Sequence, residues 1–252
     1  MVPGSYPSAV VVELGPPGTT TCGGTLIAPT WVLTAGHCVA MPGGAAYPAP
    51  DVHVIAGRFH RSNAAEGMSV GAARVIPYPS YAGALLVNVR YPDVALVELA
   101  QAVPFPTSRV VGPSERTLWS AGATATAVGW GSDGGNGPSE TPNEADQLIH
   151  SDDECASIFT GSSVAIGNTT LLTTSRWDAK AMLCAGDDVA GVCSGDSGGP
   201  LFVRLPGPER ILRIAGVVSE GSTCPSTAIF TRVGEPTISS WIAGLVPGSV
   251  GP

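Results

Sequence analysis

The chain of 252 residues lacks any apolar stretch approaching the roughly 20 residues that a membrane-spanning helix needs. It also lacks a basic excess: 12 Lys and Arg stand against 20 Asp and Glu, a net charge of −8. This balance argues against non-specific binding to nucleic acid or to an anionic membrane. Lysine is nearly missing, because arginine supplies 11 of the 12 basic residues. That usage is typical of a GC-rich coding genome and predicts a bacterial origin.

Zinc-type cysteine spacing is also missing. The six cysteines form no CxxC pair, and no Cys/His cluster has the spacing of zinc ligands. By themselves the residues leave two interpretations open, which are six free buried thiols or three disulfides.

Strand signals dominate what is present. Gly and Pro, 33 and 23 residues, separate short apolar runs, as in an all-β sandwich or barrel. The predicted strands are Ala9–Leu14, Thr25–Leu33, Val52–Gly57, Ala72–Ile76, Val94–Leu99, Thr124–Val128, Pro200–Arg204, Ile211–Ser219 and Ala228–Val233. Helix signals are few: a capping box at Ser151 opens a segment to about Phe159, and Pro236 opens one that ends near Leu245. The length suits one large β domain or two small barrels sharing a core.

The run Gly195–Pro200, with the sequence GDSGGP, carries the clearest chemical signal. A serine flanked by glycines can stand on a tight turn with its hydroxyl exposed and backbone N–H groups aimed at one point. Such a turn supplies a nucleophile and an oxyanion hole together. Upstream, His37 lies beside Cys38 after an apolar run, and Asp93 opens an apolar strand. His, Asp, Ser is one of the chain orders known for hydrolytic triads.

With these segments the chain resembles the chymotrypsin family of trypsin-like serine proteases. The matching blocks follow the family's order along nearly the whole chain: Cys22–Ile27, Thr34–Cys38, Asp93–Val97, Gly129–Gly131, Met182–Gly186, Gly195–Pro200 and Trp241–Ile242. The resemblance implies two antiparallel six-stranded β-barrels with the active site in the cleft between them, and a short C-terminal helix. Residues 1–112 are expected to form the first barrel and 113–252 the second, together one peptidase domain.

The resemblance also implies three disulfides, Cys22–Cys38, Cys155–Cys184 and Cys193–Cys224, and therefore an oxidising, extracellular location. The first residues, Met1–Ser5, lack the basic and apolar regions of a signal peptide. We therefore expect the sequence to be a mature form or a fragment of a secreted protein.

The family's catalytic roles fall on His37 as general base, Asp93 as its orienting carboxylate and Ser197 as nucleophile. Ser219 matches a serine that sits close to this aspartate. The backbone N–H groups of Gly195 and Ser197 would bind the oxyanion. No metal or organic cofactor is implied.

The primary specificity pocket is expected to have Gly191 at its base, and it has no carboxylate there. The remaining substrate-binding residues implied are Val192, Ser194, Val218, Gly221 and Ala228. Such a pocket is apolar and partly filled, which favours small or medium aliphatic residues and disfavours Arg and Lys. The link from Cys224 to Phe230 is shorter than is usual in the family. We also expect an Arg90–Glu220 ion pair to make the neighbouring subsites polar; two unrelated surface charges are the alternative.

Asp196 matches the aspartate that receives a new N-terminal ammonium when family members are activated. Six residues precede Pro7 and span at most about 20 Å, so neither Met1 nor Val2 is expected to reach it. We therefore expect Asp196 to rotate, find another donor or stay solvated, and the chain as written to have an imperfect oxyanion hole and weak activity.

The partners expected are polypeptide substrates and protein protease inhibitors, with the chain a monomer. An inactive protease-fold binding protein is the alternative. An α/β-hydrolase is disfavoured because its order is Ser, Asp, His and its strands alternate with helices.

Overall fold

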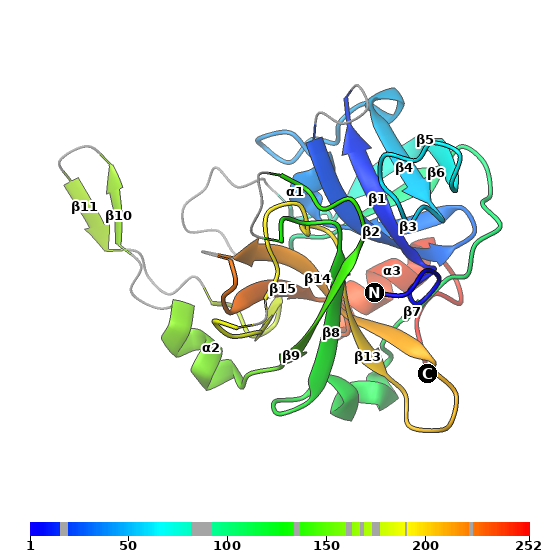
Figure 1. The fold of residues 1–252 in the computed structure, drawn as a ribbon. Helices are drawn as coiled ribbons and strands as arrows, with labels where there is room; N and C mark the ends of the chain where they lie inside the picture. The colour runs from blue at the N-terminus through cyan, green and yellow to red at the C-terminus, as the bar shows by residue number, and fades with distance from the viewer. Residues whose placement is uncertain are drawn as a thin grey trace.

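The computed structural model describes residues 1–15, 20–81, 92–133, 137–159, 163–166, 169–172, 177–189, 191–221 and 224–252. Six antiparallel strands form a closed barrel in the order β1-β2-β3-β6-β5-β4 (Figure 1). They are β1 (Ala9–Leu14), β2 (Thr20–Ala28), β3 (Trp31–Thr34), β4 (Val52–Ala56), β5 (Met68–Pro77) and β6 (Ala95–Leu99). A four-residue helix, α1 (Gly36–Val39), directly follows β3, and a 3-10 turn, η1 (Ala49–Asp51), precedes β4.

The run Thr25–Leu33, predicted as one strand, is divided in the structure. The chain reverses between β2 and β3, so that Thr25 pairs with Leu33 and Ala28 with Trp31. The turn contains Pro29, which has no N–H to give to a ladder. The prediction of a continuous strand was wrong because the apolar pattern runs through the turn.

The second sheet contains six antiparallel strands in the order β12-β15-β14-β13-β8-β9. They are β8 (Thr124–Gly129), β9 (Asn143–Leu148), β12 (Met182–Ala185), β13 (Pro200–Arg204), β14 (Leu212–Gly221) and β15 (Ala228–Arg232), while β7 (Arg109–Val110) pairs parallel with β14. A single bridge between Ile149 and Ala185 joins the two ends of the sheet. The sheet is therefore a curled partner to the closed barrel, and the expected chymotrypsin-type fold is confirmed.

The helices begin where the caps predict. The Glu154 N–H donates a hydrogen bond to Ser151 Oγ at 3.2 Å, and the Ser151 N–H donates one to the Glu154 carboxylate at 2.8 Å. This capping box begins α2 (Asp152–Phe159). The C-terminal helix α3 (Pro236–Leu245) has Pro at its first position, and Trp241 packs edge-on against Tyr78 of the first half, 5.1 Å between ring centres.

A 3-10 helix and a β-hairpin are among the elements that were not predicted. A 3-10 helix, η2 (Pro113–Trp119), lies between the halves of the chain, and β10 (Ser163–Ile166) with β11 (Thr169–Leu172) forms a separate hairpin that projects from the body (Figure 1). No helix in the described part of the chain is long and apolar enough to cross a bilayer.

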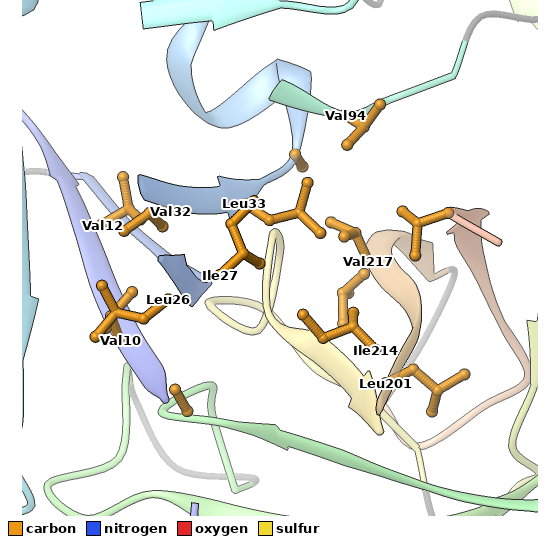
Figure 2. Packing of buried hydrophobic residues seen from close by; sticks show 14 of the residues in the cluster. Val10, Val12, Leu26, Ile27, Val32, Leu33, Val94, Leu201, Ile214 and Val217 are labelled. Atoms are coloured by element: carbon orange, nitrogen blue, oxygen red, sulfur yellow. The ribbon is translucent and has the colours of Figure 1, made fainter. Parts of the chain in front are cut away.

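One hydrophobic cluster joins the two sheets. Ile27 and Leu33 of the first barrel lie opposite Val217 and Ile214 of β14, with Leu201 of β13 beside them (Figure 2). All of these side chains are less than 5% exposed. Because the two sheets share this core, the loops at their facing edges have fixed positions relative to one another.

Candidate active site

His37 and Asp93 form the most tightly bonded pair at the junction of the two sheets. His37 lies on α1, and Asp93 lies just before β6, the strand that pairs with β3. The His37 N–H donates to Asp93 Oδ1 at 2.9 Å, and His37 Nδ1 lies 2.6 Å from Asp93 Oδ2. A carboxylate on Nδ1 fixes the imidazole ring and leaves Nε2 as the nitrogen that can accept a proton.

The second sheet also contacts Asp93. The β14–β15 ladder shifts register between Val218 and Glu220, which leaves Ser219 without a paired residue. Ser219 Oγ donates to Asp93 Oδ2 at 2.7 Å, and Thr231 Oγ1 donates to the Asp93 carbonyl oxygen at 2.7 Å. Asp93 is therefore fixed from both halves of the molecule.

His37 and Asp93 each stabilise the charged form of the other. Burial favours the neutral imidazole, but the carboxylates of Asp93 and Glu220 outweigh it and raise the pKa of His37 above its ordinary value. Burial works against the Asp93 carboxylate too, yet His37 and the hydrogen bond from Ser219 hold the pKa of Asp93 below its ordinary value. Burial and the nearby Asp93 charge raise the pKa of Tyr81, so its hydroxyl stays protonated.

The serine turn is attached to the first barrel by its backbone. The Gly23 N–H of β2 donates to the Ser197 carbonyl oxygen at 2.7 Å. Gly198 has a φ of +79°, and a Cβ added there would lie 3.1 Å from the Ala35 nitrogen. Only glycine fits this left-handed position against the segment that leads into His37. The turn and the histidine segment are therefore immediate neighbours.

Two backbone N–H groups of the turn have no acceptor in the part of the chain that the structure describes. Within the described residues, neither the Gly195 N–H nor the Ser197 N–H donates a hydrogen bond. Ser197 Oγ makes none either, and Cys38 Sγ is the contact of His37 Nε2, at 3.7 Å. Hydrogen bonds between a nucleophile and its base are often long without substrate and shorten when it binds. The turn thus presents one hydroxyl and two N–H groups that an incoming carbonyl could meet.

Asp196 is held by two backbone donors. The Gly131 N–H donates to its Oδ1 at 2.8 Å and the Cys193 N–H to its Oδ2 at 2.9 Å. A Cβ at Gly129 would lie 3.1 Å from the Asp196 carboxyl carbon, and one at Gly131 would collide with the same group. Both glycines of the Gly-Trp-Gly segment therefore make room for this side chain. Burial raises the pKa of Asp196 despite the two hydrogen bonds.

The cysteines and histidine of this region do not form a metal site. Cys22, His37 and Cys38 are the one such cluster within the described residues, but Cys22 and Cys38 are joined in a disulfide and offer no thiolate. The other two disulfides join Cys155 to Cys184 and Cys193 to Cys224. These are the three pairs that the resemblance implies.

The comparisons with known proteins agree with this geometry. The family model described as trypsin matches residues 1–242. The chain belongs to the trypsin family of serine proteases. Human serine protease 56 is 35% identical over 240 residues, which are 92% of this chain and 35% of that protein. Serine proteinase stubble of Drosophila melanogaster is 31% identical over 236 residues, 89% of this chain and 27% of that protein.

The mouse serine protease 56 is 33% identical over 238 residues, 91% of this chain and 35% of that protein. The chain thus spans about a third of the length of the relatives it matches. These relatives are animal proteins, and they do not support the bacterial origin expected from arginine usage.

The residues expected to form the specificity pocket differ in their burial. Val192, Val218 and Ala228 are at most 6% exposed, whereas Ser194, Glu220 and Gly221 are exposed at the surface. Gly191 contacts the backbone of Ser226. Arg90 lies outside the described residues, so its expected ion pair with Glu220 stays a prediction.

Three contributors were missed from the sequence. Thr231 and Ser226 are polar residues in or near an apolar strand, with no motif to mark them. Tyr81 packs against α1: a Cβ at Gly36 would lie 2.9 Å from its ring. The Gly-Trp-Gly segment was noted, but only the packing shows that its glycines accommodate Asp196.

Proposed function

We propose that this chain is a serine endopeptidase that hydrolyses peptide bonds through an acyl-enzyme on Ser197. The observation that supports this proposal most is that the Asp93–His37 pair lies beside the serine turn. The Gly23 N–H holds that turn to the first barrel through a hydrogen bond of 2.7 Å to the Ser197 carbonyl oxygen. Membership of a serine protease family supports the same reaction class. Residues 1–112 and 113–252 would act as two halves of one peptidase domain.

The reaction follows from the positions of the groups. Ser197 Oγ attacks the scissile carbonyl carbon while its proton passes to His37 Nε2, and Asp93 stabilises the imidazolium. The carbonyl oxygen becomes an oxyanion and accepts hydrogen bonds from the N–H groups of Gly195 and Ser197. His37 then protonates the leaving amine as the C–N bond breaks. Water repeats the sequence on the ester and releases the acid.

The substrate proposal rests on the pocket. Because Gly191, Val192 and Ala228 offer no charge, a cationic Arg or Lys side chain would be buried unpaired at considerable cost. Small or medium aliphatic residues on the acyl side of the cut bond are favoured. Three disulfides fit an extracellular location, where protein protease inhibitors and polypeptides would be the partners of a monomer.

A second candidate is a zymogen-like or inactive binding protein. The observation that favours it is the Asp196 carboxylate, which within the described residues is held by backbone N–H groups and has no cationic partner. If that arrangement distorts the oxyanion hole in solution, the nucleophile would be present but unreactive.

A fluorophosphonate probe separates the two candidates. We expect covalent labelling of the wild-type chain, no labelling of Ser197→Ala, and unchanged labelling of Ser120→Ala, an exposed serine on η2's C-terminal side. Peptide turnover should fall by several orders of magnitude in Ser197→Ala. Full turnover in Ser197→Ala would contradict the mechanism, and a wild-type chain that resists the probe would favour the binding protein.

A further inference from the structure

The space beside Gly191, the residue that the resemblance assigns to the base of the specificity pocket, is filled by main chain. A Cβ built on Gly191 would lie 2.7 Å from the Ser226 carbonyl oxygen and 2.8 Å from the Ser226 nitrogen, with the Pro225 Cα at 3.4 Å. Ordinary contacts of a Cβ begin near 3.4 Å. The backbone of Ser226 therefore occupies the space into which a side chain at position 191 would extend.

Ser226 is held firmly in this place. The Cys193–Cys224 disulfide ties its segment to the loop that contains Gly191, with the two Cα atoms 5.2 Å apart. On the other side, Thr227 Oγ1 donates to the Gly186 carbonyl oxygen at 3.0 Å. Five residues separate Cys224 from Phe230, and Phe230 is already paired in β15 with Leu183 and Val218. So short a connection between two fixed points has little room to swing outward.

The walls narrow the same space. Gly221 pairs with Ala228 across β14 and β15, so both residues face the same side of the sheet. A Cβ at Gly221 would lie 3.7 Å from the Ala228 methyl group. That methyl group is fully buried, as are nine-tenths or more of Val192 and Val218. The proposed pocket would thus be limited below by main chain and on its sides by these three apolar side chains.

We propose that the Ser226 backbone forms a raised floor of the pocket and, with the Ala228 methyl group, restricts the residue on the acyl side of the cut bond to Gly or Ala. This inference rests on the proposed peptidase function and narrows its substrate class. The floor also explains the absence of a side chain at position 191, since any residue larger than Gly would meet the Ser226 carbonyl.

The first test is a peptide series that varies only this substrate residue through Gly, Ala, Val, Leu, Phe and Arg. We expect kcat/KM for Ala to exceed that for Val at least about tenfold and that for Leu about 100-fold, because each added carbon must displace fixed backbone. Ala228→Gly removes one methyl group and should lower the ratio of kcat/KM for the Ala substrate to kcat/KM for the Val substrate about tenfold. Leu or Phe cleaved as fast as Ala would overturn the proposal.

The second test needs no activity. Gly191→Ala should lower the Tm by at least about 4 °C, because the new methyl group overlaps the Ser226 backbone. Gly71→Ala on β5 is the matched control, since a Cβ there meets only His53 at 4.0 Å. Equal Tm values for the two variants would show that the space is open. Failure of fluorophosphonate labelling in the wild type would instead reject the peptidase function, whereas the Tm comparison would still decide the floor.

Discussion

His37 and Asp93 are positioned by side chains, whereas Ser197 is positioned by backbone. The Asp93 carboxylate accepts hydrogen bonds from the His37 backbone N–H, from His37 Nδ1 and from Ser219 Oγ. The serine turn is held by main-chain hydrogen bonds to Gly23 and Val218 and by glycines that allow close approach. The first arrangement should therefore be sensitive to the loss of a functional group, and the second to the addition of a single carbon.

The largest effect is expected from Asp93→Asn. An amide keeps the shape of the side chain but can no longer favour the Nδ1–H tautomer or stabilise the imidazolium. We expect kcat on a peptide substrate to fall about 10⁴-fold, measured at the pH optimum of the wild type. Thermal unfolding monitors folding in the same samples. A loss of less than tenfold in a folded variant would contradict the role given to Asp93.

Gly131→Ala tests the backbone side of the comparison. The added methyl group collides with the Asp196 carboxylate, which must move and displace the turn that carries Gly195. We expect kcat to fall about 10²–10³-fold, the usual cost of losing one oxyanion donor. Because His37 and Asp93 are untouched, the acidic limb of the pH profile should stay in place.

The control for that variant is again Gly71→Ala, which adds the same carbon on β5 where the space is open. Equal activity of Gly131→Ala and Gly71→Ala would mean that Asp196 does not determine the geometry of the turn. A shift of the acidic limb of the pH profile in Gly131→Ala would mean that the serine turn and the His37–Asp93 pair are not independent of each other.

The division between side chain and backbone also explains what the sequence could predict. Residues whose chemistry lies in the side chain, such as His37, Asp93 and the paired cysteines, stand in recognisable motifs. β1 was predicted with its observed bounds because five of its six residues are apolar, four of them consecutive. β9 was missed because Asn143–Leu148 is mostly polar: it lies at the edge of the sheet, where only Gln147 is buried.

Contributions that depend on close approach could not be predicted. Nothing in the sequence states that the Ser226 main chain lies against Gly191, or that Gly129 and Gly131 border Asp196, because these contacts join distant segments. The structure gives Asp196 two backbone donors, which is one of the three outcomes expected for it. Pattern alone likewise left sandwich and barrel open, and only the resemblance separated them.

The smallest effect should come from Glu220→Gln, which removes a charge near His37 without touching the Asp93 pair. Only neutral His37 can accept the Ser197 proton, so activity rises as pH increases through the pKa of His37. Burial lowers this pKa, but the Asp93 and Glu220 carboxylates raise it above the ordinary value of 6.5. The ascending limb of the wild type should therefore lie above pH 6.5, and Glu220→Gln should move it to lower pH. Since Glu220 is exposed and its charge is screened by solvent, we expect activity at pH 6 to rise only about two- to threefold.

Glu209→Gln, which removes the same charge from the turn at the other end of β14, should leave the ascending limb of the pH profile unchanged. A Glu220→Gln limb that moves to higher pH, or that moves no further than that of Glu209→Gln, would show that Glu220 does not contribute to the field at His37.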